Sequence, residues 1–518
     1  MIRYARRPWR SAAALLTVLA LQACGGGGGG SSSDASNVDP ANNADGLGVQ
    51  GHLSGTQAIG QANPAGQADM GPESGAVTLR DDGTALATWR INDPKATQNN
   101  TLAWSQMDSR GNWSTAQTLT QMKGRLSYLP ITLRSNAAGD AVLAWANDTY
   151  NTTNTQNVGQ ALVYARATGW SATAITQGSG PGWPNYQDPR SWALDIQEDG
   201  TLLSTAVNGS GLSGLLRVDA SGQQTFSPAD PTSIISAFAP FSSASNPTGL
   251  TFYFDGNART ARVRLGTSTD PSLFASLPVQ AGSSCNNYLR FAPIIAKASS
   301  SQAGVAAITL ADDISPSYTC NTHRMFLTRA DTVPFFRISS IQANAPHTAL
   351  DFPPQIAIDQ QGRALAIWCE GVLNNYYYTS NWQCKWSKSL PGEAWSTAQD
   401  LILNLPQVGN YSGSSRPVLA MNANGDAVAA IKLASTNVST VDERIVVARF
   451  SFAQGWQPWF IAANKLALSI PAVSINASGA AMLSYSGFDL PRVGGHAPNG
   501  WYTSGANAPV NRVFALRF

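Results

Sequence analysis

A glycine-centred turn recurs through most of the chain at nearly constant intervals, and this repeat limits the possible folds more than any other feature of the sequence. Its copies are Asp81-Asp82-Gly83, Ala137-Ala138-Gly139, Glu198-Asp199-Gly200, Gln360-Gln361-Gly362, Ala423-Asn424-Gly425 and Ala477-Ser478-Gly479, with weaker copies at Asp255-Gly256 and Gln302-Ala303-Gly304. Consecutive glycines lie 56, 61, 56, 48, 58, 63 and 54 residues apart. A regular period of this length indicates a repeat architecture in which each copy forms one supersecondary unit.

The residues around each glycine indicate strands. An alanine or leucine stands two residues after every copy, and six residues after three of them stand Trp89, Trp145 and Trp368. Residues at even offsets share one face of a strand. A second alternating run precedes each turn, such as 355–358, so each copy predicts a hairpin. The repeated tryptophans are expected to pack between neighbouring repeats.

Each repeat continues with a third and a fourth short strand. Examples are 161–166 followed by Gly169-Trp170-Ser171, and 445–449 followed by Gly455-Trp456. Four antiparallel strands in about 57 residues are typical of a β-propeller blade. We therefore predict an all-β propeller over residues 49–518, with eight four-stranded blades, or seven if repeat four or five is an insertion.

The ends of the repeat region predict how the propeller closes. The last repeat supplies three strands, the third at 512–518, and lacks a fourth. Residues 51–59 resemble 111–119, the fourth strand of the first repeat. The N-terminal strand is therefore expected to complete the last blade, which would leave no open sheet edge between the chain ends.

The N-terminus predicts an exported protein. Residues 1–23 have the pattern of a secretory signal peptide, with four arginines and no acid before a short apolar stretch. They end in Leu21-Gln22-Ala23-Cys24, which resembles the bacterial lipobox. That resemblance implies cleavage before Cys24 and lipid attachment to its thiol; an ordinary signal peptide followed by a free cysteine is the alternative.

Residues 24–48 are predicted to form the lipidated cysteine and a flexible linker, because glycine and serine dominate them. By resemblance to lipoproteins of Gram-negative bacteria, Gly25 after the cysteine implies the outer membrane, on either its periplasmic side or the cell surface. The acyl chains would make the membrane the first partner of this protein.

Composition excludes two classes of protein, disordered chains and nucleic-acid binders. The chain holds 15 Trp and a net charge of only +2, whereas disordered chains are poor in aromatics and high in net charge. The same low charge leaves no basic surface for nucleic acid. The four histidines form no metal-binding motif, and no nucleotide-binding fingerprint occurs in a strand-to-helix context, so neither a metal nor a cofactor is expected.

Propeller geometry divides the connections between two faces. The first-to-second and third-to-fourth turns share one face and are short here, whereas the second-to-third and blade-to-blade connections share the other. The second set is predicted to include long loops at 92–100, 147–160, 178–191, 311–322, 370–381 and 487–500. Long loops on a rigid scaffold commonly bind ligands.

Four cysteines besides Cys24 suit disulfides in an exported chain. Cys369 and Cys384 fall in neighbouring strands of one hairpin, and Cys285 and Cys320 fall in loops of one face. We predict the pairs Cys285–Cys320 and Cys369–Cys384, one of three possible connectivities. Metal binding is disfavoured because no CxxC spacing occurs.

The long-loop face also carries aromatic, amide and charged side chains of the kinds that bind carbohydrate or peptide. The candidate ligand residues are Trp183, Tyr186, Asp188, Arg190, Glu370, Tyr376, Tyr377 and Trp382. The alternative is that they pack the long loops against each other. No catalytic constellation can be assigned.

Cys24 and the blade repeats together resemble β-propeller lipoproteins of bacterial envelopes and, more distantly, sialidase-type propellers. Residues 108–113 and 389–395 keep the glycine and tryptophan of the sialidase Asp-box but not its serine and aspartate register. Sialidase activity is therefore not implied. The predicted function is binding or scaffolding of an envelope protein or glycan. The alternative is a glycoside hydrolase or lyase that uses Asp188 and Glu370 as acid and base.

Overall fold

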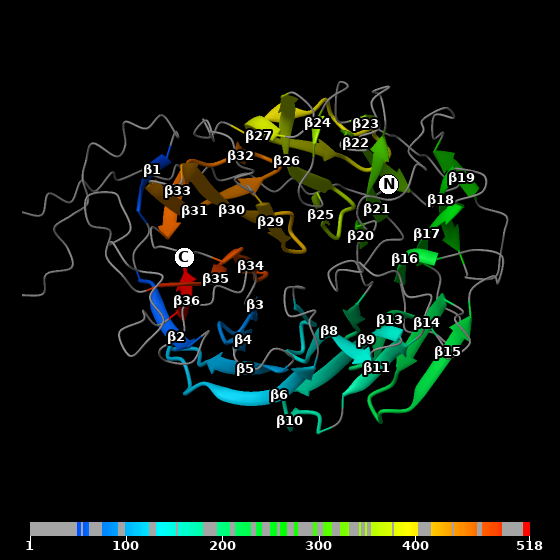
Figure 1. The fold of residues 1–518 in the computed structure, drawn as a ribbon, viewed down its shortest axis with the longest axis vertical. Helices are drawn as coiled ribbons and strands as arrows, with labels where there is room; N and C mark the ends of the chain where they lie inside the picture. Colours follow the sequence, from blue (N-terminus) through cyan, green and yellow to red (C-terminus); the bar gives the residue numbers. More distant parts are fainter. Residues whose placement is uncertain are drawn as a thin grey trace, which may run out of the picture. The chain divides into compact units, whose positions relative to one another are not determined.

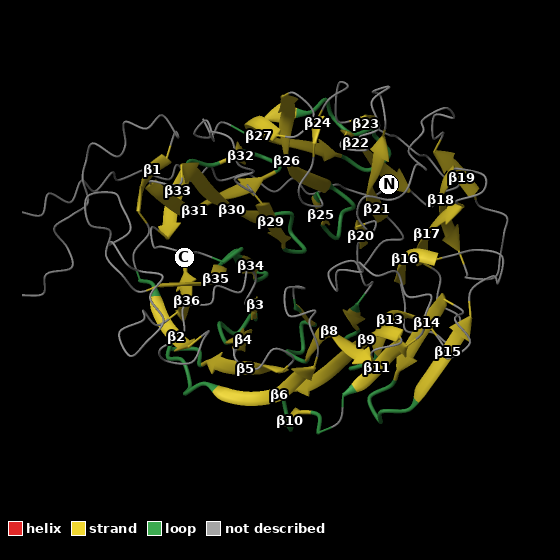
Figure 2. Cartoon of the chain, viewed as in Figure 1, coloured by secondary structure: helices red, strands yellow, loops and turns green. Residues whose placement is uncertain are grey.

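The structure is a computed structural model of the chain. It describes residues 49–52, 55–61, 75–91, 99–123, 131–151, 154–172, 174–179, 194–207, 213–228, 235–240, 249–255, 260–266, 274–277, 294–297, 304–312, 322–330, 341–342, 348–349, 354–374, 378–401, 416–437, 440–463, 469–488 and 511–518. Every regular element in these ranges is a β-strand (Figure 2). No described segment is a helix long and apolar enough to cross a membrane.

The described strands form seven sheets, and most of their strands are labelled in Figure 1. Sheet 1 contains β3 (Gly75–Leu79), β4 (Ala85–Ile91), β5 (Asn99–Met107) and β6 (Gln117–Lys123). Sheet 2 contains β7 (Thr132–Ser135), β8 (Ala141–Asn151), β9 (Asn154–Ala165), β10 (Gly169–Trp170), β11 (Ile175–Ser179), β12 (Asp195–Ile196), β13 (Leu202–Val207), β14 (Ser213–Val218) and β15 (Gln224–Pro228). Sheet 3 contains β16 (Ile235–Pro240), β17 (Gly249–Asp255), β18 (Thr260–Gly266) and β19 (Phe274–Leu277). Sheet 4 contains β20 (Ile294–Lys297), β21 (Gly304–Asp312), β22 (Thr322–Ala330) and β23 (Ile341–Gln342).

The remaining three sheets include both N-terminal strands. Sheet 5 contains β24 (Thr348–Ala349), β25 (Gln355–Ile358), β26 (Ala364–Asn374), β27 (Tyr378–Ser389) and β28 (Gln399–Asp400). Sheet 6 contains β29 (Arg416–Met421), β30 (Ala427–Asn437), β31 (Thr440–Ser451), β32 (Gly455–Trp456), β33 (Trp459–Ala463) and the N-terminal β1 (Val49–His52). Sheet 7 contains β34 (Ala472–Ile475), β35 (Ala481–Phe488), β36 (Asn511–Arg517) and the N-terminal β2 (Gln57–Gln61).

The sheets contact one another in chain order. Between sheets, β3 contacts β7, β16 contacts β20, β20 contacts β25, β25 contacts β29, and β29 contacts β34, and within sheet 2 β7 contacts β12. β13 links sheet 2 to β16, and β34 contacts β3, so the cycle of contacts closes. Antiparallel sheets that succeed one another in this way form a β-propeller. The predicted fold class is confirmed.

The number of blades stays a prediction. The single parallel pair Gly178↔Val207 joins β11 to β13, so hydrogen bonding merges the strands of repeats two and three into sheet 2. Repeats four and five each supply a sheet of four described strands. The described strands thus follow the eight-repeat division of the sequence, although hydrogen bonding groups them into seven sheets.

The position predicted for the turn of repeat four is wrong. Asp255 pairs with Thr260, which places Asp255-Gly256 between β17 and β18, the second and third strands of sheet 3. The first-to-second connection of that sheet runs from Pro240 to Gly249. The error has a simple physical origin, because a glycine turn after an alternating run can join any two antiparallel strands.

The N-terminal strand completes the last sheet, as predicted. Gln57 pairs with Ala515 and Gln61 with Arg512, so β2 becomes the outermost strand of sheet 7. The strand begins at Gln57, the residue that matches Gln117 at the start of β6 in the resemblance between 51–59 and 111–119. Residues 49–52 instead form β1, which pairs parallel with β33 of sheet 6.

β2 also fits closely against sheet 1. A Cβ added at Gly60 would collide with Cζ2 of the Trp89 indole, so glycine at this position lets the ring approach the backbone. The Trp89 Nε1–H donates a hydrogen bond to the carbonyl oxygen of Gln61 at 2.9 Å. The strand is therefore held by the β36 ladder along one edge and by a tryptophan of sheet 1 on its face.

The repeated tryptophans form the core between sheets, as predicted. Trp89, Trp145 and Trp368 are completely buried. Trp89 packs with residues of sheet 7, Trp145 with residues of sheet 1, and Trp368 with residues of sheet 4. Each indole thus covers the preceding sheet in the cycle, and burying a side chain of this size contributes several kcal/mol.

An Asn or Asp three residues before the turn glycine fixes many of the short turns, a signal that the sequence analysis overlooked. In each such turn the glycine N–H donates to the backbone carbonyl of that residue, and the glycine has a positive φ. The Oδ1 of the Asn or Asp accepts backbone N–H groups of the turn. The residues that do so are Asp108, Asn136, Asp219, Asp359, Asn422 and Asn476.

Three of these asparagines also join neighbouring repeats. The Nδ2 of Asn136 donates to Gln197 O at 2.8 Å, and that of Asn422 donates to Asn476 O at 3.0 Å. The Nδ2 of Asn476 donates to Arg80 O at 3.1 Å, which links sheet 7 to sheet 1. The end of the sheets that carries these turns is called the short-turn end below, and the opposite end is called the hairpin end.

Candidate functional site

Three β-hairpins extend well beyond the sheets at the hairpin end. They are β8–β9, β26–β27 and β30–β31, with strands of 11 and 12 residues in each pair. Their ladders continue to the outermost pairs Asn151↔Asn154, Asn374↔Tyr378 and Asn437↔Thr440. The connections at their tips are therefore only two or three residues long.

The loops predicted at 147–160 and 370–381 are wrong in extent, because most of their residues belong to these hairpins. The outer part of β8–β9 pairs Asp148 with Asn157 and Thr149 with Gln156, so both faces are polar. Alternation of apolar and polar residues reveals a strand only where one face is buried. A two-sided polar hairpin lacks that signal and resembles a loop in sequence.

At the base of β26–β27, a buried carboxylate contacts a lysine and an indole. The hairpin register pairs Trp368 with Lys385, and a bulge follows Glu370. Glu370 is 7% exposed, and its Oε2 accepts a hydrogen bond from Trp368 Nε1 at 3.0 Å. Its Oε1 lies 3.5 Å from Lys385 Nζ, which also donates to Asp400 Oδ1 at 2.9 Å.

Burial raises the pKa of Glu370 to about 7, although the Trp368 and Lys385 contacts act in the opposite direction. Burial lowers the pKa of Lys385, but the hydrogen bond and the charges of Asp400 and Glu370 raise it more, so the net shift is upward. The lysine therefore keeps its positive charge while the neighbouring carboxyl group exchanges its proton near neutral pH. A carboxyl group with such a pKa has the acidity that a general acid requires.

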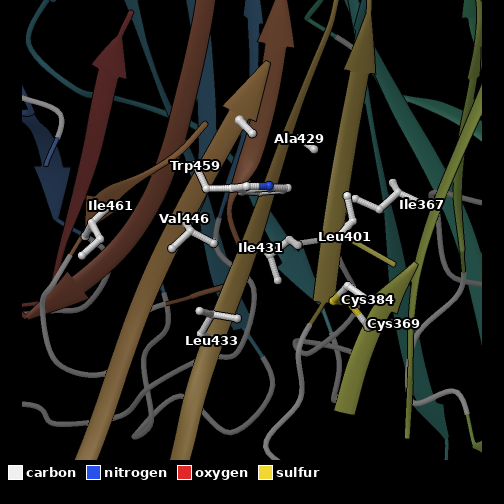
Figure 3. Packing of buried hydrophobic residues seen from close by; sticks show 11 residues of the cluster. Ile367, Cys369, Cys384, Leu401, Ala429, Ile431, Leu433, Val446, Trp459 and Ile461 are labelled. Atoms are coloured by element: carbon white, nitrogen blue, oxygen red, sulfur yellow. A yellow bond between two sulfur atoms is a disulfide. The ribbon is translucent and has the colours of Figure 1, made fainter. Parts of the chain in front are cut away.

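A disulfide lies between these pairs on the opposite face of the hairpin. Cys369 and Cys384 are bonded, as predicted, with their Cα atoms 3.9 Å apart. Figure 3 shows their sulfur atoms near Ile367 and Leu401 in a cluster that also contains Trp459, Val446 and Leu433 of sheet 6. This shared cluster packs the base of β26–β27 against the base of β30–β31. The predicted pair Cys285–Cys320 lies outside the described residues.

Among the predicted ligand residues, the structure describes the side chain of Glu370 alone. It places that residue in β26, buried, rather than in a loop. Trp382 lies in β27. Cys24, Trp183, Tyr186, Asp188, Arg190, Tyr376 and Tyr377 lie outside the described residues.

Sequence reasoning missed Lys385 and Asp400. The spacing of Trp368, Glu370 and Lys385 could have indicated Lys385, because residues two apart on a strand share a face with the residue opposite. Asp400 comes beside Lys385 only through the pairing of β28 with β27. No group of three or more His, Cys, Asp and Glu residues that could hold a metal ion occurs in the part of the chain that the structure describes.

No protein-family model matches the chain, and no curated protein matches its sequence. Solved structures with a similar chain trace include the α-L-arabinofuranosidase Arb93A from Fusarium graminearum, which is 10% identical with a TM-score of 0.37 and covers 90% of this chain and 98% of its own. The β-propeller domain of the trilobed protease from Pyrococcus furiosus is 8% identical with a TM-score of 0.33, covering 72% and 93%.

AofleA from Arthrobotrys oligospora is 8% identical with a TM-score of 0.32 and covers 67% of this chain and 89% of its own. The similar structures also include an endo-arabinase from Bacteroides thetaiotaomicron, which is 13% identical with a TM-score of 0.25 and covers 51% and 88%. Likenesses at this level transfer neither an activity nor a ligand to this chain. Its function must be argued from its own residues.

The raised pKa of Glu370 predicts a pH-dependent contribution to stability. Between its ordinary value of 4.5 and about 7, the folded state holds a proton that the unfolded chain releases. The free energy of unfolding should therefore decrease as pH rises through this range, by at most about 1.4 kcal/mol per pH unit. Urea denaturation at pH 5, 6, 7 and 8 measures this dependence.

Glu370→Gln removes the titrating group, so the stability of the wild type relative to this variant should decline from pH 5 to pH 7 and then level off. Asp400→Asn is the matched control, because it removes the other acidic contact of Lys385 and should leave the decline in place. Parallel pH profiles for the wild type and Glu370→Gln would contradict the assignment.

Proposed function

We propose that the chain is a lipid-anchored protein of a bacterial outer membrane whose propeller binds a glycan or a protein partner at the hairpin end. The supporting observation is the pair of neighbouring extended hairpins, β26–β27 and β30–β31, whose bases share one buried cluster. A disulfide crosses the base of the first hairpin. A scaffold that holds its binding segments in place before association spends less ordering entropy on binding.

The composition of these hairpins suits a polar ligand. The outer part of β26–β27 carries Asn374, Asn375, Thr379 and Ser380 beside three consecutive tyrosines at 376–378. The outer part of β30–β31 carries serine, threonine and asparagine at 435–437 and 439–440. Amide and hydroxyl groups beside aromatic rings provide both the hydrogen bonds and the stacking surface that sugars and polar peptides require.

Shortening the hairpins tests this proposal. In one variant, an Asn-Gly turn replaces 373–379 and joins Val372 to Ser380, which pair across the ladder. In the other, the same turn replaces 436–441 and joins Ser435 to Asp442. Both leave the buried bases intact. Binding to an array of bacterial envelope polysaccharides and peptidoglycan fragments, or crosslinking to envelope proteins, should fall at least tenfold in one variant or both.

Arg110→Ala at the short-turn end is the matched control and should bind as the wild type does, because Arg110 is exposed in a turn of sheet 1. Unfolding temperatures that stay within a few degrees of the wild type would exclude loss of the fold as the cause. A ligand that both shortened variants retain at full affinity would rule out the hairpin end as the binding surface.

The anchoring proposal rests on the lipobox resemblance and predicts a definite effect of Cys24→Ser. Cells that express the wild type should incorporate radiolabelled palmitate into the protein and retain it in the outer-membrane fraction. The serine variant should incorporate none and leave that fraction, because serine lacks the thiol that takes the lipid. Equal labelling of both proteins would contradict lipid attachment at Cys24.

A second function, hydrolysis or lysis of a polysaccharide, is favoured by the buried carboxyl group of Glu370, whose burial raises its pKa to about 7. Such a group could donate a proton to a leaving oxygen if substrate reached it. Release of reducing ends from an envelope polysaccharide by the wild type, lost in Glu370→Gln and kept in Asp400→Asn, would favour this function over binding alone.

A further inference from the structure

Both N-terminal strands begin at the same end of the propeller. β1 runs parallel to β33, with Val49 paired to Trp459 and His52 to Ile461. β2 runs antiparallel to β36, with Gln57 paired to Ala515 and Gln61 to Arg512. The direction of each strand therefore follows from the direction of its partner.

The Trp459 end of β33 lies at the short-turn end. β33 follows the third-to-fourth turn at Gly455, and within that turn Trp456 pairs with Phe450 near the end of β31. Phe450 pairs with Ala427, the first residue of β30 after the turn at Gly425. Val49, which is paired to Trp459, is thus located on the side of the short turns.

The start of β2 lies at the same end. Ala515 is near the end of β36. Phe518, just after that strand, exchanges backbone hydrogen bonds with Ala481, which directly follows the turn at Gly479. A Cβ on Gly55 would lie 4.0 Å from the Leu516 side chain. β1 and β2, which belong to two different sheets, therefore both show that the N-terminal segment enters the propeller from the short-turn end.

β1 is held in place because it covers an apolar edge strand, β33. Its partner β33 has the sequence Trp-Phe-Ile-Ala-Ala, and four of these five side chains are buried. The outer strands of other sheets are more polar, as in Gln57–Gln61 and Gln117–Lys123. An uncovered apolar edge strand is a site of unwanted pairing, so covering this one with β1 stabilises the folded monomer.

We propose that the short-turn end faces the membrane and that the hairpin end points away from it. This inference rests on the proposed lipid anchor at Cys24. A Gly/Ser-rich coil of 24 residues, the length of the predicted linker, has an r.m.s. span of about 27 Å. A strand of 11 residues such as β30 is itself about 37 Å long. The linker starts from the short-turn end at Val49, so the opposite orientation would require it to pass the full length of a blade.

The orientation explains why the two ends of the propeller differ. The short-turn end carries the compact turns whose side chains link one sheet to the next, as Asn476 does to Arg80. The long hairpins stand at the end that the linker does not reach first. A binding surface that points away from the lipid is free to meet large partners, such as an envelope polymer or a protein of another layer.

Energy transfer in reconstituted vesicles tests the orientation. A donor dye is attached through p-azidophenylalanine placed at Arg110, in a turn of the short-turn end, or at Asn437, the last residue of β30. Rhodamine-labelled lipid in the vesicle is the acceptor. Transfer should be at least twofold more efficient from position 110 than from position 437. Inserting 40 further Gly and Ser residues after Gly30 should reduce that ratio.

Equal transfer from the two positions, or stronger transfer from position 437, would overturn the orientation. The same comparison on protein coupled through Cys24 to a maleimide lipid keeps this result independent of natural acylation. If only the chemically coupled protein attaches to vesicles, the anchor proposal fails while the orientation is still measured. If the wild type attaches but both positions transfer equally, the anchor proposal stands and the orientation fails.

Discussion

The fit of strand β2 between β36 and Trp89 is the constraint on which the rest of the structure depends. Sheet 7 takes three strands from the C-terminal part of the chain and its fourth from residues more than 400 positions away. The Trp89 indole lies against Gly60 and donates its N–H to Gln61 O. Sheets 1 and 7 meet at this strand as well as through the contact of β3 with β34, so the N-terminal segment completes the closed cycle of sheets.

Closure also connects the shape of the domain to its proposed role. The Asn476–Arg80 hydrogen bond and the Ala477 N–H to Asp81 Oδ1 bond at 2.7 Å join the same two sheets at the short-turn end. At the hairpin end, the disulfide and the cluster around Trp459 and Leu433 hold two long hairpins at their bases. At the short-turn end, hydrogen bonds thus join neighbouring sheets, whereas at the hairpin end long hairpins extend past the core.

Sequence periodicity predicted the parts of this structure that have a buried face. Trp89, Trp145 and Trp368 recur at one offset because each packs on the preceding sheet, and Gln57 matches Gln117 because both begin an outermost strand. The pairing Cys369–Cys384 followed from the position of both residues in one hairpin. Where local pattern and tertiary burial agree, a sequence carries enough information to place a strand.

Other parts could not be predicted from local pattern. The outer half of β8–β9 is composed mainly of polar residues, and in the outer half of β26–β27 the apolar Val372 and Leu373 are adjacent rather than alternating, so these strands resemble loops in sequence. β1 covers the edge of β33 through backbone hydrogen bonds, which its sequence Val-Gln-Gly-His does not reveal. The environment of Glu370 depends on Lys385 and Trp368, which only the hairpin register brings beside it. The contacts of Glu370 could therefore be identified only once the fold was known, whereas the fold itself could be predicted from the sequence repeat.

A double-mutant cycle between Gly60 and Trp89 tests the closure most directly. Gly60→Ala should lower the free energy of unfolding by about 1–3 kcal/mol, because the added methyl group collides with the indole. In a Trp89→Phe background, where the atoms that the methyl group meets are gone, the cost should fall by about 1 kcal/mol or more. Urea denaturation of the four proteins measures both values. An alanine at position 60 that costs the same in both backgrounds would contradict the packing of β2 against sheet 1.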